Sequence, residues 1–190
     1  MSDFTTPMAP LSPLGGQFPR IDMHGPVTLS ENTDTALASY AARLGHEAAA
    51  TRNLSTFIGA ALPRPGHAHL GDVSALWIAV DQWMVIAPHG THEDLADQLT
   101  ACAEGFASVT EQNDAWCRFD LTGTGLSDVF ERLCPFNIRA CVGGEATRTS
   151  IDHLGCLLMV TSPEEIAVFG PRSSAGSLHH ALLTAIKSAH

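Results

Sequence analysis

Alternating and helically spaced apolar residues in the C-terminal third of the chain predict a strand, a short helix and the turns between them. Polar and apolar residues alternate over 118–121, which is typical of a half-buried strand. Gly123 and Gly125 follow and favour a tight turn. Apolar residues then recur at helical spacing over 126–133, and Pro135 predicts the end of this helix because proline has no N–H donor.

The remaining C-terminal pattern predicts a strand pair, a returning strand and a closing helix. An apolar segment over 149–160 is interrupted near its centre by the Asp-His pair at 152–153, and it predicts two strands. A polar turn at 162–165 leads to a further strand at 166–169. Leucine and isoleucine residues then form one stripe over 173–190, which predicts an amphipathic helix docked on a sheet.

The N-terminal part of the chain begins with a segment that is rich in Pro, Gly, Ser and Thr. This segment, residues 1–26, predicts an extended arm with little structure of its own. Such an arm is either a flexible tail or a segment that orders on a neighbouring subunit. Beyond it, the pattern predicts a strand at 27–29 and a helix at 34–44, after which 47–53 is expected to lead into an edge strand. The range 55–62 is ambiguous, and a short helix stays open there.

The middle of the chain predicts a hairpin and a helix that link these segments. Two apolar runs over 77–86 flank Asp81, which predicts a hairpin turn there. A helix follows Thr91, and a strand follows at 106–110. Taken together, the segments predict an α+β fold class with mostly antiparallel sheets and packed helices. Residues 27–190 are expected to form a single domain, and a division into two lobes near 108–114 stays open.

The composition limits the kinds of partner that the chain can have. The chain has 190 residues, of which 45% are hydrophobic, so a core of good size is expected. Its formal net charge of −10 disfavours nucleic acid and anionic membrane surfaces, since both are bound through Lys and Arg. The sequence has no apolar run of the roughly 20 residues that span a bilayer and no secretory-signal pattern at its start. We therefore expect a cytoplasmic protein.

Candidate chemistry is sparse along the sequence. The five cysteines are scattered without a Cys-x-x-Cys pair, which indicates reduced thiols; a small enzyme that uses Cys134 is the weakest alternative. His67 and His69 have no third metal ligand at a suitable spacing. Gly123-Thr124-Gly125 lacks the third glycine of a dinucleotide-binding motif, because Asp128 occupies that position. The sequence predicts no catalytic, cofactor-binding or metal-binding residue.

Several short motifs occur in a fixed order and carry a resemblance to a known family. They are Asp-Leu-Thr-Gly-Thr-Gly at 120–125, Leu-Cys-Pro-Phe-Asn at 133–137, Ala-Thr-Arg-Thr-Ser at 146–150, Gly-Pro-Arg-Ser at 170–173, and a Trp-rich segment at 75–86. With the closing helix, this order resembles the gamma subunit of heterotetrameric sarcosine oxidase. The chain departs from that family's pattern at Ala79-Val80, Asn137 and Ser173-Ser174. The resemblance covers roughly 74–186, and the family is related to the folate-binding fold of aminomethyltransferases.

The resemblance implies that the chain belongs to an enzyme complex but does not itself catalyse the reaction of that complex. The complex of that family oxidatively demethylates sarcosine to glycine, forms peroxide and passes the one-carbon unit to tetrahydrofolate. Its FAD, FMN, NAD and tetrahydrofolate belong to the alpha, beta and delta subunits, and the gamma subunit has a role in assembly. The resemblance therefore predicts those three subunits as partners, and whether the isolated chain forms a homodimer stays open. It also indicates Arg172, Arg148 and Trp83 as residues that contact a partner or ligand.

Arg172 is the foremost of these candidates because it lies between a proline and the terminal helix, and a guanidinium can form a forked pair with a carboxylate. The alternative function is a free-standing folate-binding or aminomethyltransferase-like protein. It requires a carboxylate in a pterin pocket, for which Asp81 and Asp120 are the candidates. A buried acid in a pocket would favour this alternative, whereas a wide uncovered apolar surface would favour the subunit.

Overall fold

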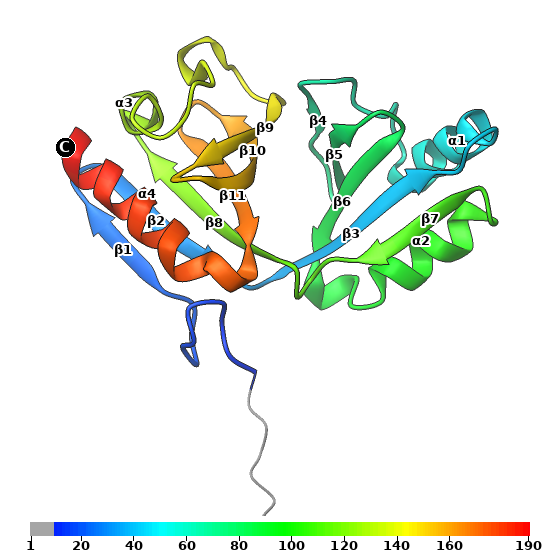
Figure 1. Cartoon of the computed structure of the whole chain (residues 1–190), viewed down its shortest axis with the longest axis horizontal. Coiled ribbons are helices and arrows are strands. Elements are labelled where there is room, and N and C mark those ends of the chain that lie inside the picture. Colours follow the sequence, from blue (N-terminus) through cyan, green and yellow to red (C-terminus); the bar gives the residue numbers. More distant parts are fainter. Residues whose placement is uncertain (1–9) are drawn as a thin grey trace, which may run out of the picture.

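Two antiparallel sheets, each with helices on its outer face, make up the computed structural model, which describes residues 10–190 (Figure 1). The six-stranded sheet has the order β1-β2-β8-β11-β10-β9, and the five-stranded sheet has the order β4-β5-β6-β3-β7. This architecture confirms the predicted α+β fold class. No described helix is both long enough and apolar enough to cross a membrane.

The six-stranded sheet takes its strands from both ends of the described chain. Its strands are β1 Ile21–His24, β2 Val27–Asn32, β8 Trp116–Gly123, β9 Ala146–Ile151, β10 Leu154–Ser162 and β11 Glu165–Pro171. Helices α3 (Leu126–Phe130) and α4 (Ala175–Ala189) pack on it. Short 3-10 turns lie at Ile138–Ala140 and at Arg172–Ser174, where the second leads into α4.

The five-stranded sheet is formed by the intervening segment of the chain. Its strands are β3 Thr35–Ala42, β4 Ala68–His69, β5 Ser74–Ala79, β6 Gln82–Pro88 and β7 Ala107–Glu111. Helices α1 (Glu47–Ile58) and α2 (Leu95–Ala103) cover its outer face, and a 3-10 turn at His89–Thr91 precedes α2.

Two of the sequence-based assignments in this segment are wrong. The helix predicted at 34–44 is strand β3, and the segment 47–53, which was expected to lead into an edge strand, is the first part of helix α1. β3 lies between β6 and β7, and residues on both of its faces are buried, so its alanine-rich sequence lacks the alternation of a half-buried strand. The range 55–62, left undecided by the sequence, continues α1 as far as Ile58, and Gly59 ends it with a φ of 70°.

The predicted hairpins are confirmed where the turn residues carry a local signal. Asp81, with a φ of 54°, forms the turn between β5 and β6. Asp152 and His153 have φ values of 47° and 65°, so they form a two-residue turn between β9 and β10. Both side chains of that turn are exposed, and the terminal helix predicted at 173–190 is α4.

The predicted arm at 1–26 includes strand β1, which pairs antiparallel with β2 through the turn at Gly25. Its first nine residues lie outside the described part of the chain. The described residues before β1 lie against the six-stranded sheet, because backbone groups of Leu14 and Arg20 bond to Glu31 of β2. Much of the arm is thus built into the fold.

The chain crosses between the sheets twice, after β2 and after β7, and a shared core joins their facing surfaces (Figure 1). Leu37, Leu76 and Met84 of the five-stranded sheet pack with Leu157 and Phe169 of the six-stranded sheet in this core. The two crossings and the arm meet at one end of the core. This meeting point holds the pocket described next.

Candidate functional site

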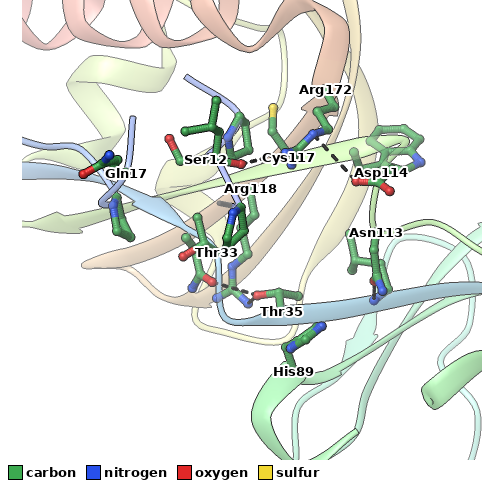
Figure 2. Close-up of a pocket in the computed structure, with 17 residues that line it drawn as sticks. Ser12, Gln17, Thr33, Thr35, His89, Asn113, Asp114, Cys117, Arg118 and Arg172 are labelled. Carbon is green, nitrogen blue, oxygen red and sulfur yellow. Dashed lines mark hydrogen bonds and ion pairs between the residues drawn. The ribbon is translucent and has the colours of Figure 1, made fainter. Parts of the chain in front are cut away.

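A pocket of about 390 Å³ lies at the junction of the two sheets and the N-terminal arm (Figure 2). The arm supplies one wall from Pro10 to Pro19, and the β2–β3 crossing supplies another. The remaining wall comes from His89 just after β6, the segment after β7, the start of β8 and Arg172 just after β11; its polar members are His89, Asn113, Asp114, Arg118 and Arg172.

Arg118 is held from several sides within this junction. Its Nε donates to Asp120 Oδ1 at 2.7 Å, and its Nη1 donates to Thr35 Oγ1 at 3.2 Å. The guanidinium also lies 5.5 Å from the centre of the Phe169 ring, within range of a cation–π contact. Asp120 accepts a second bond from Asn32 Nδ2 at 2.7 Å. These contacts tie β8 to both ends of the β2–β3 crossing.

Arg172 contacts the arm of its own chain. Its Nη2 donates to the carbonyl oxygen of Leu11 at 3.1 Å, while its Nε lies 3.9 Å from Asp114 Oδ1, which is too long for a hydrogen bond. Its backbone N–H donates to the carbonyl of Ala115 at 2.9 Å and fixes the end of β11 against the start of β8. Contact of Arg172 with a partner or ligand stays a prediction.

The other two candidate residues do not join Arg172 in the pocket. Arg148 is exposed on edge strand β9. Trp83 is buried in the core beneath α1 and α2, where its Nε1 donates to the carbonyl of Pro63 at 3.2 Å. Of the three, Arg172 alone lines the junction pocket, so the structure does not bring them together into one site.

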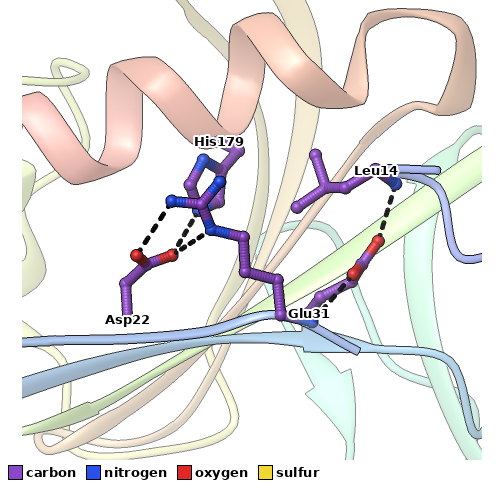
Figure 3. Close-up of polar contacts among 5 residues, drawn as sticks. Leu14, Asp22, Glu31 and His179 are labelled. Atoms are coloured by element: carbon purple, nitrogen blue, oxygen red, sulfur yellow. Dashed lines mark hydrogen bonds and ion pairs between the residues drawn. The ribbon is translucent and has the colours of Figure 1, made fainter. Parts of the chain in front are cut away.

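The arm is anchored by a buried carboxylate that the sequence analysis did not identify (Figure 3). Glu31 on β2 is only 4% exposed. Its Oε1 accepts the N–H of Leu14 at 2.8 Å, and its Oε2 accepts the N–H of Arg20 at 3.0 Å. The signal in the sequence was the alternation of Val27, Leu29 and Glu31, which places this carboxylate on the buried face of β2.

A second polar group beside Glu31 links β1 to α4. Asp22 Oδ2 accepts from Arg20 Nε at 2.8 Å and lies 2.8 Å from Nε2 of the buried His179 (Figure 3). The Arg20 hydrogen bond, with that of His179 as a smaller cause, holds the pKa of Asp22 below its ordinary value. Because the folded pKa is lowered, this stabilisation is present above about pH 4 and is lost as the pH falls through the folded pKa.

Glu31→Gln is expected to loosen the arm. The amide nitrogen would meet a backbone N–H that now donates to a carboxylate oxygen, so we expect a loss of about 1–3 kcal/mol and faster trypsin cleavage after Arg20. Cleavage rates of the native protein would be followed by mass spectrometry. Glu93→Gln, at an exposed position just before α2, is the control, and equal cleavage rates in the two variants would contradict the anchoring role of Glu31.

The cysteines provide no activated thiol in the core. All five are free, and burial raises the pKa of Cys117 and of Cys156 to about 11. We therefore expect both to resist iodoacetamide at pH 8 in the native protein and to react fully in urea, because the thiolate is the reactive form. Peptide mapping measures the labelling, and rapid native labelling of Cys117 would contradict this expectation.

The remaining candidates for chemistry are separated or already paired. Asp81 lies in the β5–β6 turn, and Asp120 is occupied by Arg118 and Asn32. His67 and His69 lie at β4, and residues 10–190 contain no group of three His, Cys, Asp or Glu side chains that could hold a metal ion.

Comparison with known proteins gives structural matches only. No family model matches the sequence, and no curated protein matches it. A chain of heterotetrameric sarcosine oxidase from Corynebacterium sp. U-96 superposes with a TM-score of 0.76 at 22% identity, over 88% of each chain. Aminomethyltransferase T of the glycine cleavage system from Bartonella henselae gives a TM-score of 0.61 at 16% identity; the match covers 80% of this chain and 44% of that one. The chain therefore has the fold shared by these two proteins, which confirms the predicted resemblance at the level of the fold.

Proposed function

We propose that the chain is the gamma subunit of a sarcosine oxidase complex and that it serves the assembly of the complex without catalysing its reaction. The observation that carries this proposal is the match to a chain of heterotetrameric sarcosine oxidase, because it extends over 88% of both chains. The ordered motifs over 120–173 support the same assignment, since they follow that family's gamma subunit.

The junction of the two sheets supports an architectural role. Its two arginines are engaged within the chain: Arg118 donates to Asp120 and Thr35, and Arg172 donates to the carbonyl oxygen of Leu11 in the arm. In this proposal the alpha, beta and delta subunits are the partners and carry FAD, FMN, NAD and tetrahydrofolate. The complex would work in the cytoplasm, where it would demethylate sarcosine to glycine, form peroxide and transfer the one-carbon unit to tetrahydrofolate.

Affinity capture of the tagged chain from its native cells, grown on a methylated amine, tests the proposal. We expect flavin-containing subunits to copurify and the captured material to form peroxide when sarcosine is added. Recovery of the chain alone at several salt concentrations, without flavin absorbance, would contradict the proposed function.

The likeness to an aminomethyltransferase keeps one alternative open, a free-standing folate-binding protein. Tetrahydrofolate titration of the purified chain, followed by calorimetry, tests it directly. Saturable binding that Asp81→Asn or Asp120→Asn abolishes would favour this alternative. Because Asp120 is already bonded to Arg118 and Asn32, we expect no such binding from its carboxylate.

A further inference from the structure

Strand β1 has one edge that no described residue pairs with. It forms the end of the six-stranded sheet and pairs on its other side with β2, with Ile21 opposite Ser30 and Met23 opposite Thr28. The N–H of Glu31 donates to the carbonyl of Arg20 at 2.8 Å, in register with this ladder. Since hydrogen-bonded pairs alternate along an antiparallel ladder, the backbone N–H and C=O groups of Ile21 and Met23 point to the free edge.

The side chains of these same two residues are exposed and apolar. Ile21 is 64% exposed and Met23 is 78% exposed. They lie on the face opposite α4, because Asp22 between them contacts His179 on that helix. Phe18, three residues before β1, is 81% exposed. Unpaired backbone groups and uncovered apolar side chains therefore coincide on one short segment.

The other three edges of the two sheets differ from β1. Strand β9 exposes Arg148 and Ser150, and strand β7 exposes Ser108, Thr110 and Glu111. Strand β4 has only two residues and is followed closely by β5. Among the described edges, only β1 carries large exposed apolar side chains. Proteins commonly protect edge strands with charges or by shortening them, and an unprotected edge is a template for another strand.

We propose that the free edge of β1 receives an extended strand from a partner subunit, an inference that rests on the proposed function. The partner strand extends the six-stranded sheet by backbone hydrogen bonds to Ile21 and Met23. Its apolar side chains cover Ile21 and Met23 on one face. On the other face it presents neutral or basic residues instead of acidic ones, because the chain has a net charge of −10.

In two of its registers a second copy of this chain fits the edge poorly. Two β1 strands related by a two-fold axis at Asp22 would set two Asp22 carboxylates directly opposite each other, which is unfavourable. An axis at Met23 would set Ile21 opposite Gly25 of the second copy, which lies in a turn with a φ of 55°. That register leaves about three residues paired on each strand.

The length of β1 also favours a partner with further contacts. Its four residues span roughly 13 Å at about 3.3 Å per residue, whereas a stable interface buries about 1,600 Å² in total. The strand is therefore one part of a larger interface, as expected between subunits of a complex.

Met23→Pro tests the hydrogen bonding of the edge. Proline removes the N–H that points outward and leaves the bonds to β2 in place. The double variant I21K/M23K tests the apolar cover while keeping the backbone intact. Val80→Lys is the matched control, because Val80 is 76% exposed in the β5–β6 turn. Thermal unfolding of each isolated variant verifies that it folds like the wild type.

Each tagged variant would be used to capture the flavin-containing subunits from native cells that lack the untagged chain. We expect Met23→Pro and I21K/M23K to recover at least about tenfold less flavoprotein than wild type, and Val80→Lys to recover the same amount. Equal capture by a folded edge variant would overturn the inference and leave the proposed function intact. Absence of flavoprotein with the wild type would instead contradict the proposed function, and the inference with it.

Light scattering of the isolated chain tests whether a second copy of this chain, instead of a partner subunit, occupies the edge of β1. We expect a monomer for both wild type and Met23→Pro across the accessible concentrations. A wild-type dimer that Met23→Pro converts to a monomer would identify a second copy at this edge and overturn the assignment to a partner subunit.

Discussion

Phe169→Ala is expected to lower the free energy of unfolding by about 3–5 kcal/mol, because the ring fills the core between the two sheets and the cavity would close only partly. Phe169 is 1% exposed and belongs to the same cluster as Leu37 and Met84 of the five-stranded sheet. It also supports the guanidinium of Arg118 at 5.5 Å. Urea unfolding followed by circular dichroism and by tryptophan fluorescence measures the loss.

Phe18→Ala is the matched control for this change. Phe18 is 81% exposed, so we expect its replacement to change stability by no more than about 0.5 kcal/mol. A loss below about 1 kcal/mol for Phe169→Ala would contradict close packing of the sheets. Separate transitions for the two signals in the variant would show that the shared core is what makes the two sheets unfold together.

Gly123→Ala is expected to be the most disruptive small substitution, with a loss of more than about 3 kcal/mol. Gly123 ends β8 with a φ of 125°, a conformation that other residues rarely adopt. A β-carbon there would lie 2.0 Å from the carbonyl oxygen of Pro26, so the β1–β2 turn would have to move. Thermal unfolding monitored by circular dichroism measures the effect.

Gly176→Ala gives the opposite expectation and serves as the control. Gly176 lies within α4, and an added β-carbon would meet nothing within 4 Å. Alanine there should stabilise the protein by about 0.5–1 kcal/mol through its higher helix propensity. Equal stability of the two variants would contradict the steric conflict expected between residue 123 and the β1–β2 turn.

Elements with strong local signals were predictable from the sequence. The β5–β6 and β9–β10 hairpins turn at polar residues with positive φ, namely Asp81, Asp152 and His153. Helix α4 carries one apolar stripe that includes Leu178 and Leu182. In these segments, turn chemistry and periodicity act over a few residues, so they do not depend on the rest of the fold.

The segment over 34–53 was mispredicted, and at its strand burial overrides local preference. Ala36, Ala38 and Tyr40 face the core beneath α1 and α2, while Leu37 faces the other sheet. An alanine-rich segment favours a helix by propensity, but its place between β6 and β7 makes it a central strand.

Of the residues at the candidate site, the sequence indicated only Arg172, and it did not indicate the contacts of that residue. The Pro-Arg-Ser motif indicated Arg172, but the side chain of Arg172 donates to the carbonyl of Leu11, which lies 161 residues away in the sequence. Glu31 had no motif at all, and its importance comes from two N–H groups of the arm. Such contacts depend on which distant segments the two crossings bring together.

The sequence by itself determined the α+β class, the hairpin turns and the closing helix, because each rests on patterns within short segments of the chain. Only the tertiary structure decided that residues before and after the five-stranded sheet form one six-stranded sheet. It alone placed Phe169 between the sheets, docked the arm on Glu31 and left the edge of β1 without a described partner. The physical reason is that burial and strand pairing depend on contacts between distant residues, which no local pattern encodes.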